Sequence, residues 1–272
     1  NKLKGQLEQG RKWYADLGAA GEMDGLLAAL AGRHIPTSYG GDPIKNPDAL
    51  PTGRNLYGFD PSRVPTKQAW EAGKEAAAAL IAAHRAKTGR APKKLTFTLW
   101  SVETMRHQGL LEAQALAAMG VEPVWDAGGR VIDVRLIPRE QLGRARVDVV
   151  LSATGLYRDH FPNAMKQLAK AAELAARANE ADNPVYANSQ RIAASLKQRG
   201  VPEAAAQRAA ETRIFSNASG RYGTGLDDAA LATDTWKNKA EGDRKLAQLY
   251  LRNMQCAFGS DESTWGRKGT TG

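Results

Sequence analysis

A chain of 272 residues is long enough to bury a sizeable core, as one large domain or two smaller ones. Its single cysteine excludes an internal disulfide bond and a multi-cysteine zinc site, and no stretch approaches the roughly 18 apolar residues of a membrane span, so we expect a soluble, cytoplasmic protein. The net charge is +9, but the basic residues are spread among acidic ones without interleaved aromatics, which argues against nucleic acid and leaves an anionic small molecule or an acidic partner protein.

The N-terminal part of the chain predicts helices followed by an irregular connector. Residues 1–32 carry leucines at helical spacing, interrupted by glycines. From 34 to 65, recurring prolines and glycines argue against a long regular helix or strand. Thr66 is then expected to cap a helix that runs to about residue 87. We therefore expect a helical segment with a Pro/Gly-rich connector over 1–65 and an α/β domain over 66–272.

Strands and helices alternate through the second part of the chain. We expect strands at 95–100, 122–125, 131–137, 147–151 and 213–216, and helices at 103–119, 162–179, 187–199, 203–211 and 240–255. The strand at 147–151 is wholly apolar, which is typical of the interior of a parallel sheet. The pattern predicts the α/β class, with a Rossmann-like open sheet flanked by helices over about 92–216.

Three of these strands end in polar loops rich in small residues, at 100–107, 152–159 and 216–222. Parallel strands place such loops at one edge of the sheet, where α/β proteins bind their ligands. The arginines and carboxylates there would suit bidentate binding of carboxylate groups. The candidate substrate-binding residues are Glu103, Arg106, His107, Thr154, Arg158, Asp159, Asn217, Arg221 and Tyr222.

Structural explanations stay open for each group. Glu103 and Arg106 would form a surface ion pair on a helix, and Arg158 with Asp159 would only cap the helix that follows. His107 would serve in packing. The loop at 213–228 would be a long surface turn with a helix N-cap at Asp227.

Several catalytic signatures are absent from the sequence. There is no P-loop, no GxGxxG after the first strand and no GxSxG elbow, and the histidines have no partners at metal-ligand spacing. The residues alone therefore predict a ligand-binding α/β domain without self-contained catalytic machinery and without a bound metal.

Four segments, in order, resemble one known family. They are LPTGRNLYGFDPSRVPT at 50–66, FTLWSVETMRH at 97–107, LGRARVDVVLSATGLYRD at 142–159 and RIFSNASGRYGTGLDD at 213–228. They are similar to segments of the large chelatase subunits, a family that comprises the CobN cobaltochelatase subunit and the H subunit of magnesium chelatase. The variants SVETMRH and SATGLYRD look closer to CobN.

The resemblance implies a large subunit that binds a tetrapyrrole and a metal ion, together with an AAA+ ATPase subunit and an integrin-domain subunit. For CobN, the implied reaction is ATP-dependent insertion of Co²⁺ into hydrogenobyrinic acid a,c-diamide, in cobalamin biosynthesis. ATP would bind to the AAA+ ATPase subunit. The resemblance also implies an internal piece of a longer chain, because the family's HxGxHG segment is absent here, and we expect the piece alone to be inactive.

On this hypothesis Arg106, Arg158 and Arg221 bind corrinoid carboxylates, and Glu103 and Asp159 orient them. Two alternatives stay open: an H-type protein that serves Mg²⁺ and protoporphyrin IX, and a scaffold whose loops and Pro-rich segment dock the ATPase subunits. The basic stretch at 237–245 departs from the more acidic family pattern, which puts a partner contact there in doubt.

Overall fold

The computed structural model describes residues 2–19, 21–38, 49–56 and 59–268. The chain divides into two compact units, Asn1–Phe59 and Asp60–Gly272, and each is described by itself. In the described residues, no helix is long and apolar enough to cross a lipid bilayer.

The first unit consists of two helices and a small sheet. The helices are α1 (Lys2–Leu17) and α2 (Gly21–Leu30), as the leucine spacing predicts, and their leucines are exposed. Strand β1 (Thr37–Ser38) pairs in parallel with β2 (Asn55–Leu56). Much of the predicted Pro/Gly-rich connector, at 39–48 and 57–58, lies outside the described residues.

The end of the connector belongs to the second unit. Asp60 caps a short 3-10 helix, η2 (Pro61–Arg63), and the indole N–H of Trp125 donates a 3.0 Å hydrogen bond to the Pro65 carbonyl. Thr66 then caps α3 (Lys67–Thr88), because its hydroxyl accepts a hydrogen bond from the Ala69 N–H. The predicted capped helix is confirmed, and the segment before it packs on the α/β unit.

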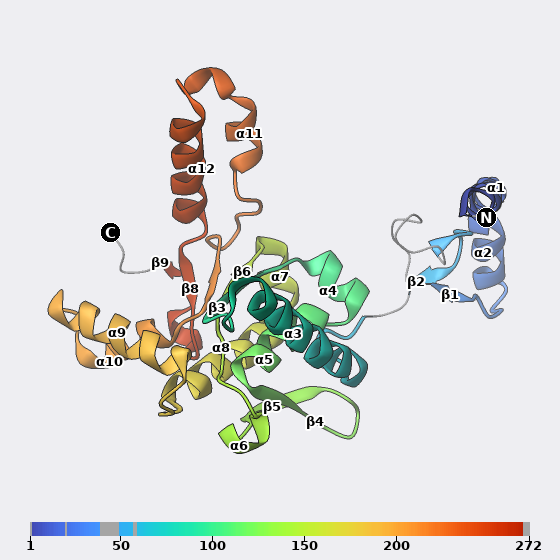
Figure 1. Ribbon diagram of the computed structural model, residues 1–272. Coiled ribbons are helices and arrows are strands. Elements are labelled where there is room, and N and C mark those ends of the chain that lie inside the picture. The colour runs from blue at the N-terminus through green and yellow to red at the C-terminus, as the bar shows by residue number, and fades with distance from the viewer. Residues whose placement is uncertain (1, 20, 39–48, 57–58, 269–272) are drawn as a thin grey trace. The chain divides into compact units, whose positions relative to one another are not determined.

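A five-stranded open sheet forms the centre of the second unit (Figure 1). In spatial order its strands are β3 (Lys94–Leu99), β6 (Asp148–Ala153), β7 (Ile214–Ser216), β8 (Cys256–Phe258) and β9 (Arg267–Lys268). The first three are parallel, as expected, whereas β8 and β9 join antiparallel. The sequence did not predict these last two short strands.

The register gives the sheet two different faces. One row across the sheet is Phe97, Leu151, Ile214 and Phe258, each no more than 6% exposed. This closed face is covered by α5 (Leu110–Met119) and α8 (Pro162–Arg177), with α3 packed on α5. The next row, Thr98, Ser152, Phe215 and Ala257, forms what we call the open face, and only Ser152 in it is buried.

Two predicted elements differ from the structure. The single helix expected at 103–119 is two, α4 (Ser101–His107) and α5, because Gln108 and Gly109 both have positive φ, 54° and 94°. Close packing also requires the glycine, since a Cβ there would lie 2.6 Å from the Pro65 Cα. The strands β4 (Val121–Trp125) and β5 (Val131–Leu136) are real, but they form a separate antiparallel hairpin.

The remaining helices connect and surround the sheet. They are α6 (Arg139–Leu142), α7 (Gly155–His160), α9 (Pro184–Gln198), α10 (Glu203–Glu211), α11 (Leu226–Leu231) and α12 (Lys239–Asn253), with 3-10 turns η3 (Thr233–Thr235) and η4 (Glu262–Thr264). Helix α11 begins at Leu226 with Gly225 at its N-cap, so the proposed cap at Asp227 is wrong. Helices α11 and α12, which come between β7 and β8 in the chain, form a pair that projects away from the sheet (Figure 1).

Candidate functional site

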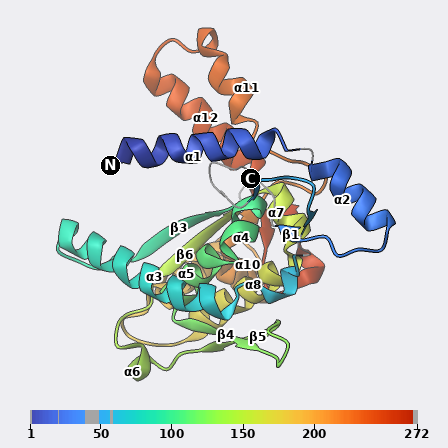
Figure 2. The same cartoon turned by 90° about the vertical axis from the view of Figure 1, so that its right-hand side faces the viewer.

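Three loops meet at the carboxyl edge of the parallel strands. Strand β3 leads directly into α4, β6 leads into α7, and β7 leads into the loop before α11. Because β6 lies between β3 and β7, its loop touches both of the others. Helices α4 and α7 lie side by side there (Figure 2). We call this edge the rim.

The first two loops are joined by one hydrogen bond. Ser101 Oγ and His160 Nδ1 lie 2.7 Å apart, and Ser101 is buried while His160 is exposed. The sequence did not single out this pair: Ser101 belongs to the 97–107 segment, but it was not among the candidate residues, and 59 residues separate it from His160. Thr154, at the start of the second loop, caps α7 by accepting a hydrogen bond from the Tyr157 N–H.

Arg158 joins the second loop to the third. Its side chain is only 7% exposed, and Nη1 donates to the carbonyl oxygens of Asn217 and Ala218 at 2.9 and 3.0 Å. Its Nε donates to Asp159 Oδ1 at 2.8 Å, and this hydrogen bond lowers the pKa of the Asp159 carboxyl below its usual value. Arg158 therefore holds the third loop in place, with most of its donors already used inside the protein.

Further hydrogen bonds, one to α7 and one within the loop itself, fix the third loop. The Tyr222 hydroxyl donates to Asp159 Oδ2 at 2.6 Å, and Asn217 Nδ2 donates to the Gly223 carbonyl at 2.6 Å. Gly155 permits this approach, because a Cβ at that position would lie 2.4 Å from the Arg221 carbonyl oxygen. Four of the predicted residues, Arg158, Asp159, Asn217 and Tyr222, thus form one hydrogen-bond network.

The candidates on α4 form a separate group. Arg106 pairs with Glu103 three residues earlier on the same exposed helix face. His107 Nδ1 accepts hydrogen bonds from the N–H groups of Gly109 and Leu110, so this ring stabilises the break between α4 and α5. Burial, followed by the charge of Arg106, lowers the pKa of His107 and favours the neutral ring.

Arg221 differs from the other arginines of the rim. It is exposed in the third loop, and its side chain makes no hydrogen bond or ion pair with any residue that the structure describes. It is therefore a cation available to a ligand. Among the described residues, no three His, Cys, Asp or Glu side chains lie close enough together to hold a metal ion.

Comparison with known proteins identifies the relatives of this chain. The family model for CobN/Magnesium Chelatase matches residues 3–270. The chain belongs to the CobN/magnesium chelatase family. The aerobic cobaltochelatase protein CobN of Pseudomonas aeruginosa is 38% identical over 98% of this chain, and the magnesium-chelatase H protein of Rhodobacter capsulatus is 38% identical over 88% of it.

A solved structure of this family has the same fold. The catalytic subunit of cobaltochelatase from Mycobacterium tuberculosis matches with a TM-score of 0.76 and 39% identity over 92% of the chain. The chain spans about a fifth of the length of these relatives: 21% of the Pseudomonas CobN, 19% of the Rhodobacter H protein and 20% of the Mycobacterium protein. The predicted family is confirmed, and the roles of the rim residues stay predictions.

Proposed function

We propose that this chain is part of the large tetrapyrrole-binding subunit of an ATP-dependent cobaltochelatase, a metal ligase. The complex would insert Co²⁺ into hydrogenobyrinic acid a,c-diamide in cobalamin biosynthesis. Membership of the CobN/magnesium chelatase family supports a chelatase subunit. Identity does not separate the two branches, since the CobN relative and the magnesium-chelatase relative are both 38% identical. The choice of cobalt therefore rests on the motif variants SVETMRH and SATGLYRD.

The observation that carries the proposal is the position of Arg221. It lies in the third rim loop, and its side chain pairs with no residue that the structure describes. Hydrogenobyrinic acid a,c-diamide bears several carboxylates, and a guanidinium binds a carboxylate bidentately through a planar pair of N–H groups. Arg158 and Asp159 would keep the third loop in the conformation that presents Arg221. Arg106 would be a second cation, partly neutralised by Glu103.

The proposed division of labour leaves chemistry to other parts of the complex. ATP would bind and be hydrolysed on an AAA+ ATPase subunit, with an integrin-domain subunit coupling that hydrolysis to metal insertion. Co²⁺ would enter as a substrate. These 272 residues would bind and orient the macrocycle.

The function is tested with the full-length protein and both partner subunits. We expect ATP-dependent loss of free hydrogenobyrinic acid a,c-diamide when Co²⁺ is supplied, followed by absorbance, and no turnover of protoporphyrin IX with Mg²⁺. The reverse preference would assign the chain to the magnesium-chelatase branch. Turnover of neither pair would overturn the chelatase assignment.

A docking role for the partner subunits is the second candidate. The projecting pair α11 and α12 favours it, because Leu231 on α11 is 83% exposed. Capture of the ATPase or integrin-domain subunit by the full-length protein without any tetrapyrrole would support docking. Loss of that capture in Leu231→Gln would place the contact on this arm, and unchanged capture would remove it.

A further inference from the structure

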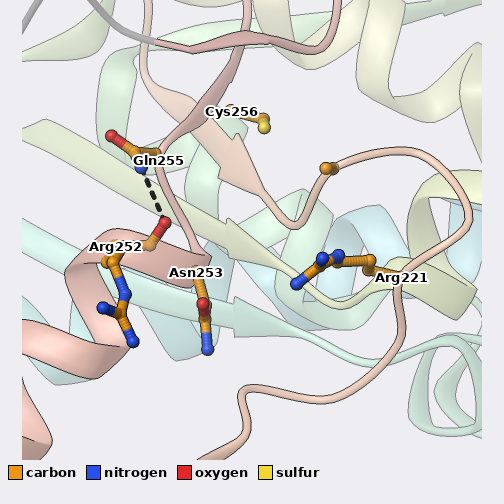
Figure 3. Close-up of a pocket in the computed structure, with 6 residues that line it drawn as sticks. Arg221, Arg252, Asn253, Gln255 and Cys256 are labelled. Carbon is orange, nitrogen blue, oxygen red and sulfur yellow. Dashed lines mark hydrogen bonds between the residues drawn. The ribbon is translucent and has the colours of Figure 1, made fainter.

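A cavity of about 340 Å³ opens between the third rim loop and the end of α12 (Figure 3). It is lined by Ala218, Arg221, Arg252, Asn253, Gln255 and Cys256. Arg221 extends toward the end of α12 from the opposite wall, as Figure 3 shows. Asn253 Nδ2 donates to the Thr224 carbonyl at 2.7 Å, which ties the two walls together.

The charge of this cavity is positive and uncompensated. Arg221 and Arg252 are both exposed, and neither side chain pairs with an acid among the residues that the structure describes. Each side-chain amide of the lining already donates one hydrogen bond inside the protein: Gln255 Nε2 donates to the Arg252 carbonyl and Asn253 Nδ2 to the Thr224 carbonyl, each at 2.7 Å. The two guanidinium groups are the charged donors of the lining, and charge-assisted hydrogen bonds to an anion are the stronger ones.

A larger cavity adjoins the first. It measures about 820 Å³ and lies over the open face, where Ser152 and Phe215 form part of its floor. Arg252 and Gln255 line both cavities, so the larger one has a cationic end. Most of its other lining is apolar: Val150, Ile192, Leu196, Ala209, Leu251, Met254 and Ala257. Both volumes fall within about 300–1,000 Å³, the range of small-molecule sites.

We propose that the two cavities form one amphipathic site for a tetrapyrrole that carries carboxylates. The apolar ring would lie on the open face, and a peripheral carboxylate would bind Arg221 and Arg252. Charge complementarity and the apolar floor favour this ligand over a neutral one. The inference rests on the proposed function. It adds Arg252 and the larger cavity, which the rim motifs do not include.

The arginines are tested by titrating the full-length protein with hydrogenobyrinic acid a,c-diamide, followed by absorbance. We expect about a tenfold loss of affinity in Arg252→Gln and in Arg221→Gln, and a larger loss in the double variant. The matched control is Arg244→Gln, an exposed arginine on the same helix that lines neither cavity, and its affinity should equal that of the wild type. With the fully methyl-esterified macrocycle, the difference between the wild type and the variants should disappear.

The role of the larger cavity is tested by Leu251→Gln. Leu251 lines that cavity and is 67% exposed, so its replacement leaves the core intact. Weaker binding with an unchanged Tm is expected. A lower Tm with unchanged affinity would show that a polypeptide segment covers the larger cavity. That result would overturn the proposal. Wild-type binding that none of these variants weakens would overturn the site and leave the proposed function standing. No binding by the wild type would overturn both.

Discussion

The two faces of the sheet come from the same strands but have different environments. The closed face presents Phe97, Leu151 and their neighbours in register to α5 and α8, and these side chains are almost fully buried. One residue further along each strand, the open face presents Ser152 and Phe215 to the larger cavity. Because side chains alternate along a strand, one segment can stabilise the fold on one face and bind on the other.

The largest effect is expected on the closed face. Phe97→Ala should lower the free energy of unfolding by about 3–5 kcal/mol, because it leaves a cavity in the core beneath α5. Thr98 is the next residue along the strand and is exposed, so Thr98→Val should change the free energy of unfolding by less than about 0.5 kcal/mol. Urea denaturation measures both. Equal losses for the two variants would show that the open face is also packed.

The next effect sharpens the difference between buried and available arginines. Arg158→Met should cost about 1.5–3 kcal/mol, because the carbonyl oxygens of Asn217 and Ala218 lose a charged donor. Amide hydrogen exchange over residues 217–225 should accelerate. Arg106→Met is the control and should cost less than about 1 kcal/mol, since the Arg106 side chain is exposed to solvent. If exchange in the loop does not change, Arg158 does not hold it.

A smaller effect is expected at the helix layer over the closed face. Thr66→Ala removes the cap of α3 and should lower the free energy of unfolding by about 1 kcal/mol. Thr66→Ser keeps a hydroxyl that accepts from the Ala69 N–H and should recover most of this stability. If the Ala and Ser variants are equally destabilised, methyl packing rather than capping explains the loss.

The smallest effect depends on pH. The pKa of His107 is lowered in the folded protein, chiefly by burial, so the unfolded chain takes up this proton more readily. The stability that the neutral His107 contributes is therefore fully present above pH 6.5, the ordinary pKa of histidine, and decreases as the pH falls below it. Between about pH 7.5 and about pH 5.5, the Tm of His107→Asn should fall less than that of the wild type, because Asn can accept the same N–H groups without charging. A steeper fall in the variant would contradict this.

Local patterns predicted much of the fold. The apolar run at 147–151 and the polar loops after it correctly indicated a parallel strand inside an α/β sheet, and Thr66 correctly marked the start of a helix. The break at Gln108 was not predictable, since its positive φ is rare for glutamine and results from tertiary packing. The antiparallel strand β8 is only three residues long, too short to show a periodicity.

The candidate site was predictable in position but not in detail. The order of the strands placed three loops at one edge, yet composition does not distinguish a buried arginine from an available one. Arg158 is buried because two backbone carbonyls of a distant loop accept its N–H groups. Arg252 belongs to the site only through the path of α12, and nothing in its local sequence marks it.

The central claim is tested most directly by the structure of the full-length protein with bound hydrogenobyrinic acid a,c-diamide, determined by electron cryomicroscopy. We predict the ring over the open face and a carboxylate within hydrogen-bond distance of Arg221 and Arg252. A macrocycle bound elsewhere, with both arginines paired to protein acids, would contradict this account.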